Sequence, residues 1–100
     1  MKFKKSDYKE LFGVLSSIQN EKQWEKVAAD LFTPNELETF VERWKVAKEL
    51  LGTDKSQREI QKDIPCALAT VSRANKQLKN KNGGFVFLWK ALKEKISKES

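Results

Sequence analysis

The sequence predicts an all-α protein that contains a helix-turn-helix. Apolar residues recur at steps of three and four along most of the 100 residues, which is the period of an amphipathic helix. Residues typical of helix starts and stops separate these segments, and no stretch shows the strict alternation of a half-buried strand. Near residue 65 two short helical segments meet at a tight junction, as the two helices of a helix-turn-helix do.

The first two helices are expected at about residues 6–19 and 22–31. In each, apolar residues return once per turn, so each helix has one face to bury. The face of the first comprises Tyr8, Leu11, Phe12, Leu15 and Ile18, and that of the second Trp24, Val27, Ala28 and Leu31.

A third helix is expected from Thr33 to about residue 51. Thr33 is suited to cap it, Pro34 to its first turn, and Glu36 to complete a capping box. Gly52 lies just past the end, where glycine commonly stops a helix. The apolar stripe comprises Leu37, Phe40, Val41, Trp44, Ala47 (or the stem of Lys48), Leu50 and Leu51.

The helix-turn-helix is expected at about residues 56–80, with helices at 56–64 and 66–80. Ser56 and Glu59 form a second capping box, and Pro65 ends the first helix because the residue before a proline resists helical geometry. The expected inner residues are Ile60 and Ile64 in the first helix and Leu68 or Val71, with Leu78, in the second.

A loop at Asn80–Gly84 precedes the last helix, and the lysine-rich tail from Lys95 to Ser100 is expected to fray. No repeat or linker divides the chain, so residues 1–100 are read as a single domain. The last helix has an apolar stripe of Phe85, Leu88, Trp89, Leu92 and Ile96.

The charge balance points to an anionic partner. Twenty Lys and Arg against fourteen Asp and Glu give a net charge of +6, which suits nucleic acid or a membrane surface. No histidine and the single Cys66 argue against a zinc site and an internal disulfide. No apolar run approaches the roughly 20 residues of a membrane span, and the basic N-terminus lacks the apolar stretch of a signal peptide. A soluble cytoplasmic protein is expected.

An enzyme is not expected. The chain has no histidine, no nucleophile motif, no paired carboxylate flanked by a pocket signal and no glycine-rich phosphate cradle. A helical module for membrane surfaces or protein partners is an alternative to DNA binding, because the helices are amphipathic and the tail is basic. Against it, the apolar stripes are spread over all the helices, as a folded core requires.

The second helix of the helix-turn-helix carries side chains suited to the DNA major groove. Ala69, Thr70 and Ser72 are small, and hydroxyls and methyl groups can contact base edges. Lys76 and Lys79 could reach phosphates. Arg58 and Gln61, on the preceding helix, could contact backbone or bases.

Several motifs together resemble the bacterial tryptophan repressor family. They are Leu31-Phe32-Thr33-Pro34-Asn35-Glu36, Arg43, Lys48-Glu49-Leu50-Leu51, Ser56-Gln57-Arg58-Glu59-Ile60 and Ala69-Thr70-Val71-Ser72-Arg73. The likeness covers about residues 30–95 with almost no gaps. It implies a six-helix protomer, an intertwined homodimer, and an operator in double-stranded DNA with half-sites about one turn apart. It also implies L-tryptophan as corepressor and control of genes for tryptophan biosynthesis or uptake.

The resemblance assigns residues to both sites. Arg43 and Arg73 would lie on the two faces of the indole, Thr33 would contact the ligand carboxylate, and Leu31 and Phe32 would line the pocket or offer backbone carbonyls. On the family's pattern the DNA contacts would be Arg58, Gln61, Leu68, Ala69, Thr70 and Ser72.

Two departures concern the ligand. Ala74 stands where tryptophan-sensing members carry a glycine beside the indole, and Gln77 stands where they carry a serine. A related branch keeps the threonine and both arginines without the full corepressor signature, and the stretch Arg73-Ala74-Asn75-Lys76 has its form. A regulator that does not respond to L-tryptophan is therefore the alternative function.

Overall fold

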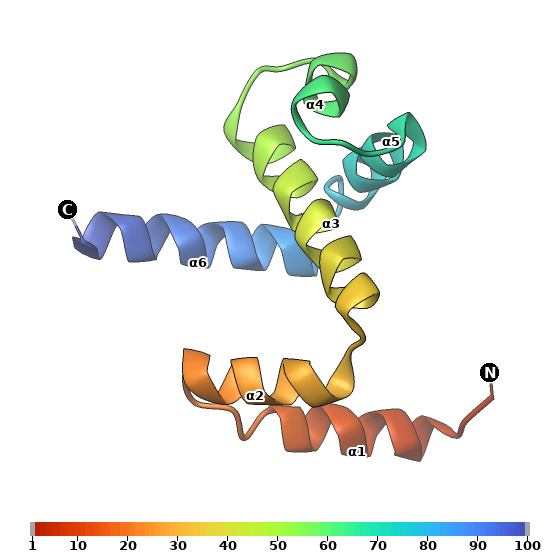
Figure 1. Cartoon of the computed structure of the whole chain (residues 1–100). Helices are drawn as coiled ribbons and strands as arrows, with labels where there is room; N and C mark the ends of the chain where they lie inside the picture. Colours follow the sequence, from red (N-terminus) through yellow and green to blue (C-terminus); the bar gives the residue numbers. More distant parts are fainter. Residues whose placement is uncertain (1, 100) are drawn as a thin grey trace. The chain divides into compact units, whose positions relative to one another are not determined.

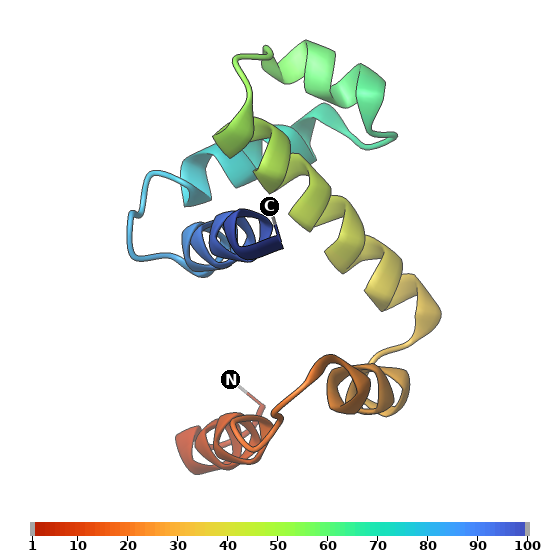
Figure 2. The ribbon, with the colours of Figure 1, turned by 90° about the vertical axis from the view of Figure 1, so that its left-hand side faces the viewer.

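The computed structural model describes residues 2–99, which form six helices and no strand (Figure 1 and Figure 2). This confirms the predicted all-α class. None of the helices in this range is long and apolar enough to cross a membrane. The helices are α1 (Lys5–Leu15), α2 (Glu21–Leu31), α3 (Pro34–Gly52), α4 (Gln57–Asp63), α5 (Leu68–Gln77) and α6 (Gly84–Glu99).

The chain forms two compact units, one up to Leu37 and the other from Glu38 onward. In the first unit α1 ends at Leu15, four residues earlier than predicted. The reason is local: the hydroxyls of Ser16 and Ser17 donate to main-chain carbonyl oxygens of the preceding turn at 2.9 and 2.6 Å. No residue of α1 or α2 is buried.

The predicted capping boxes are both present. The Thr33 hydroxyl oxygen accepts from the main-chain N–H of Glu36 at 3.1 Å, and the Glu36 carboxylate accepts from the N–H of Thr33 at 2.9 Å. Ser56 and Glu59 repeat this exchange at 3.2 and 3.1 Å. Each pair satisfies two donors that the helix itself leaves unpaired.

The second unit contains a small apolar core, with Leu50 and Cys66 packed against it. Ile60, Ile64 and Val71 are inner residues as predicted, whereas Leu68 is 38% exposed. In Figure 1, α4 and α5 lie beside the C-terminal half of α3. The core residues are Val46, Ile60, Ile64, Val71 and Ala74.

Val46 is fully buried although the predicted stripe of α3 omits it. The reason is that α3 has apolar residues on two faces. One carries Val46 and Leu50 into the core with α4 and α5. The other carries Trp44, whose ring stacks on Phe85 of α6 with centroids 6.4 Å apart. Further along that second face Val41 remains 54% exposed.

The turn between α4 and α5 is longer than predicted. Ile64 has the extended backbone that a following proline imposes (φ −118°, ψ 115°), so α4 ends at Asp63 as expected. Pro65 does not lead directly into the next helix, since α5 begins only at Leu68. Cys66 therefore lies in the turn, where burial raises the pKa of its thiol and disfavours the reactive thiolate.

The last helix is also longer than predicted. Residues from Lys95 to Glu99 continue α6 instead of fraying, and Ser100 lies outside the described residues.

Gly52 is the final residue of α3 and not a residue beyond it. No described glycine has a positive φ, so Gly52 is not needed for a left-handed turn. It is needed for space: a Cβ at this position would lie 2.7 Å from Cη2 of the Trp89 ring. The glycine thus lets α6 pack closely against the end of α3.

We expect Gly52→Ala to lower the free energy of unfolding by about 1 kcal/mol, because the Trp89 ring must shift to admit the methyl group. Gly13→Ala is the matched control: a Cβ there meets nothing within 4 Å, so better helix propensity should stabilise the protein by about 0.5–1 kcal/mol. Urea unfolding followed by circular dichroism measures both. A Gly52→Ala protein as stable as the wild type would contradict the close contact.

Candidate functional site

The outward face of α5 presents small and basic side chains. Val71 and Ala74 face the core, and the helical period places Ala69, Arg73 and Lys76 on the opposite side, where all three are exposed. Small residues beside cations are what a helix in the major groove requires, because the backbone must approach the base edges closely.

Ser72 joins the two helices of the motif. Its hydroxyl donates to Oε1 of Gln57 at 3.0 Å in a partly buried contact between α5 and α4. The hydroxyl oxygen keeps its acceptor capacity, but its hydrogen is already engaged. Gln57 was not singled out from the sequence, and no local pattern identifies such a bond because it depends on how the helices cross.

The other predicted DNA residues lie at the surface of the same unit. Arg58 on α4 is exposed and Gln61 is half-buried. Leu68, at the start of α5, is 38% exposed, and Lys79, just after its end, is exposed. Thr70 is half-buried and lies at the edge of the outward face, next to the cavity described below.

A cavity of about 80 Å³ brings together four of the seven predicted ligand residues. Arg43 reaches it from α3, and Arg73, Ala74 and Gln77 reach it from α5. The remaining lining residues are Thr70 and Phe85. Neither was predicted here: Thr70 was assigned to DNA, and Phe85 was read only as part of an apolar stripe.

The cavity has the electrostatics of an anion site. Among residues 2–98 no ion pair joins the guanidinium of Arg43 or Arg73 to a carboxylate. The Arg43 guanidinium carbon lies 5.9 Å from the centre of the Phe40 ring, so an aromatic face supports it. Two unpaired guanidiniums beside the Phe85 ring can receive a carboxylate attached to an apolar or aromatic group.

The other three predicted ligand residues belong to the first unit. Leu31 is 39% exposed, Phe32 is half-buried and Thr33 is exposed. Thr33 accepts the capping bond of α3 through its hydroxyl oxygen, which leaves the hydroxyl hydrogen to donate. No three His, Cys, Asp or Glu side chains of the described range are grouped as a metal site requires.

Comparison with known proteins identifies the family. The family model described as "Trp repressor protein" matches residues 6–95. A "Trp operon repressor homolog" of Vibrio vulnificus (strain YJ016) is 30% identical over 77 residues, which is 77% of this chain and 76% of that protein. The homologs of Vibrio campbellii and Vibrio cholerae are 30% and 29% identical over 76% and 77% of this chain, and over 76% and 75% of their own lengths. No solved structure matches significantly. The chain therefore belongs to the Trp repressor family, whose members are DNA-binding regulators of transcription and not enzymes.

Proposed function

We propose that this protein is a ligand-gated transcriptional repressor that binds operator DNA as a homodimer. The observation that carries the proposal is the exposed, small and basic face of α5 in a helix-turn-helix of a Trp repressor family member. Its targets are genes for tryptophan biosynthesis or uptake, and it acts in the cytoplasm, where bacterial DNA is found.

Unburied apolar surface supports the homodimer. Phe12 and Val14 of α1 are 62% and 60% exposed, and Phe87 of α6 is 71% exposed. In the second unit an open groove of about 680 Å³ lies along the end of α5 and the start of α6, with Leu78 and Val86 in its wall. Exposed apolar surface of this kind is typical of a protein interface, and a small chain gains a larger core by sharing one.

Phe87→Glu should raise the dissociation constant of the dimer at least about tenfold, because it places a charge in the centre of an apolar interface. Lys90→Glu, at an exposed site on the same helix, is the control and should leave the assembly unchanged. Sedimentation velocity measures the mass against the 11.6 kDa of one chain. A wild-type protein that sediments as a monomer at micromolar concentration would refute the dimer.

For DNA, α5 is proposed to enter the major groove with Ala69 against the base edges. Arg58, Gln61 and Lys76 contact the DNA beside it, and Lys79 contacts phosphate. Ser72 supports this helix through Gln57, and its hydroxyl oxygen remains available to a donor on a base. Leu68 and Thr70 flank the contact.

Ala69→Leu should reduce affinity for a selected operator at least about tenfold and leave affinity for random DNA nearly unchanged, because the larger side chain holds α5 away from the bases. Lys79→Ala should weaken binding to both DNAs alike and lower the salt slope by about one. Fluorescence anisotropy at several salt concentrations, with a duplex selected by the wild type from a random pool, separates the two effects. Equal loss on both DNAs in Ala69→Leu would show that α5 does not read bases.

L-tryptophan is the proposed corepressor. The indole would lie between the Arg43 and Arg73 guanidiniums, and Thr33 would contact the carboxylate, while Leu31 and Phe32 complete the ligand contacts. Cation–π attraction contributes about 0.5–2 kcal/mol per guanidinium in such an arrangement. Three observations support this proposal: the family, the two arginines that favour an anion in the cavity, and the aromatic Phe85 in its wall.

A second candidate is a repressor that does not respond to L-tryptophan. Two observations favour it. The cavity of about 80 Å³ is smaller than the roughly 150 Å³ that holds a benzene ring in a protein interior. Ala74 is only 4% exposed and is packed in the core, so its methyl group cannot easily yield. Gln77 is exposed, so its side chain can move aside more readily than Ala74.

Calorimetric titration with L-tryptophan decides between the candidates, with L-tyrosine and indole-3-acetate as comparisons. The first candidate predicts saturation near one ligand per chain, lost in Arg73→Ala without loss of helicity or melting temperature, because Arg73 is exposed. Arg58→Ala, which removes an arginine that does not line the cavity, should bind normally. No heat at millimolar L-tryptophan would establish the second candidate.

A further inference from the structure

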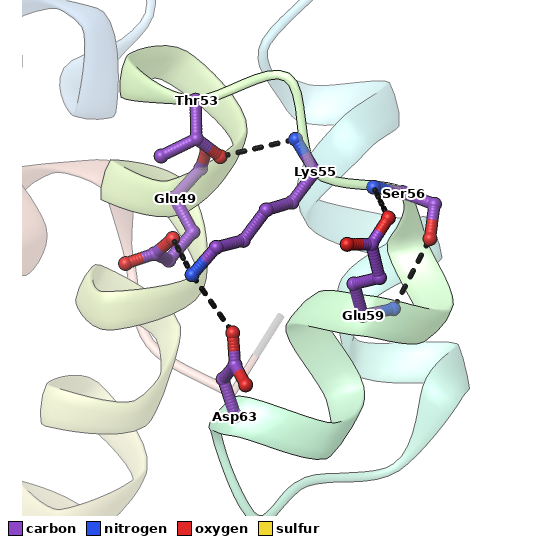
Figure 3. A network of polar contacts seen from close by, with 6 residues as sticks. All are labelled: Glu49, Thr53, Lys55, Ser56, Glu59 and Asp63. Carbon is purple, nitrogen blue, oxygen red and sulfur yellow. Dashed lines mark hydrogen bonds and ion pairs between the residues drawn. The ribbon is translucent and has the colours of Figure 1, made fainter.

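A single lysine connects α3 to the end of α4 (Figure 3). Lys55 lies in the loop between the two helices. Its Nζ is 2.8 Å from Oδ2 of Asp63 and 3.2 Å from Oε2 of Glu49. Glu49 is in the last turn of α3, and Asp63 is the last residue of α4. One cation therefore bridges two helices that pack only through a small core.

The Glu49 carboxylate depends on this lysine. Its Oε2 is shielded from solvent, and the Lys55 ammonium at 3.2 Å is the partner that the described residues offer it, so this ammonium is its compensating charge. Removing that ammonium would leave a shielded oxygen unpaired. It would also leave the Glu49 and Asp63 carboxylates close together with no cation between them. Hydrogen bonds to Asp63 and Glu49 raise the pKa of Lys55, as expected for a cation between two carboxylates.

The loop is built to hold the lysine in place. The Thr53 hydroxyl donates to the main-chain carbonyl of Glu49 at 2.7 Å, and its oxygen accepts from the N–H of Lys55 at 3.3 Å. Immediately after, the Ser56–Glu59 box fixes the start of α4 (Figure 3). The helix is thus secured at its first turn by the box and at its last residue by Lys55.

We propose that Lys55 is a positioning residue for the recognition helix: its ammonium holds Asp63, and thereby the turn that leads into α5, at a set place on α3. The turn begins at the next residue, Ile64, and α5 follows at Leu68. Lys55 acts through Asp63 and Glu49 and does not itself bind DNA. The effect on DNA recognition rests on the proposed function, whereas the effect on α4 does not.

The first test uses the sign of a charge change. Asp63→Asn removes one negative charge, so it would strengthen DNA binding if Lys55 were simply a cation near phosphate. The proposal predicts the reverse: affinity for the duplex selected by the wild type falls roughly fivefold, and affinity for random DNA does not fall. Asp54→Asn is the control. It makes the same charge change in the loop that holds Lys55, outside the ion pairs of that lysine, and should not weaken binding to either DNA.

Lys55→Met should reproduce the loss on the selected duplex, and Lys55→Arg, which keeps a cation with similar reach, should restore at least half of the affinity. Stronger binding of the selected duplex by Asp63→Asn would overturn the proposal. So would a Lys55→Met protein that binds the selected duplex as the wild type does.

The second test needs no DNA. Amide hydrogen exchange should be about fivefold faster in α4 in both Lys55→Met and Asp63→Asn, and unchanged in α6. Unchanged exchange in α4 in both variants would overturn the proposal. If the wild type selects no duplex at all, the proposed function fails, and exchange in α4 still decides whether Lys55 holds the helix.

Discussion

Burial of Ile60 in one core with Val46 is the interaction on which the proposed DNA-binding half of this chain depends. A seven-residue helix such as α4 is not stable alone in water, because too few hydrogen bonds offset the cost of nucleating it. Burying an isoleucine or valine side chain contributes about 1.5–3 kcal/mol. Ile60 and Val46 are both fully buried, and Val71 of α5 joins them. The position of α5, the proposed recognition helix, therefore depends on its packing against α3.

The ten residues of α5 face three surroundings: the core, the open surface and the cavity. The inward side is committed to Val71 and Ala74, and the opposite side is open, with Ala69 and Lys76 at the surface. The flank toward α6 carries Gln77 to the cavity. Because each turn of helix returns a residue to the same side, a substitution that serves one demand leaves the other sides intact. Three residues serve two demands: Ala74 belongs to the core and to the cavity wall, while Arg73 and Thr70 line the cavity from the outward face or its edge.

Features that depend on neighbouring residues could be predicted from the sequence. Both capping boxes and the end of α4 before Pro65 follow from residues within four positions of each other, and they were predicted correctly. Features that depend on how helices cross could not. The burial of Val46 was not predicted, because α3 packs on two faces and the sequence was read as having a single apolar stripe. The packing role of Gly52 appears only once α6 is in place.

The same limit applies to the candidate site. Arg43 and Arg73 are thirty residues apart, and the family resemblance alone suggested that they meet; the shared cavity supports that suggestion. Phe85 lacked any signal, because an aromatic residue at helical spacing is ordinary core until its neighbours are known. Thr70 was assigned to DNA from its place on α5, yet a helical residue at the edge of a face can serve either side.

The cavity lies where a ligand could control α5. One guanidinium comes from α3, which carries the core, and the other from α5, so a bound anion touches the support and the recognition helix at once. A ligand shifts a conformational equilibrium only by its difference in affinity between the two states. A ligand small enough for the present cavity fits without moving α5, so its affinity for the two states differs little. One larger than about 80 Å³ must displace Gln77 or α5, and it then favours whichever separation of α3 and α5 admits it. Under the proposed function, gating would therefore depend on the size of the ligand relative to the cavity, and Ala74, which is packed in the core, is a fixed part of the cavity wall.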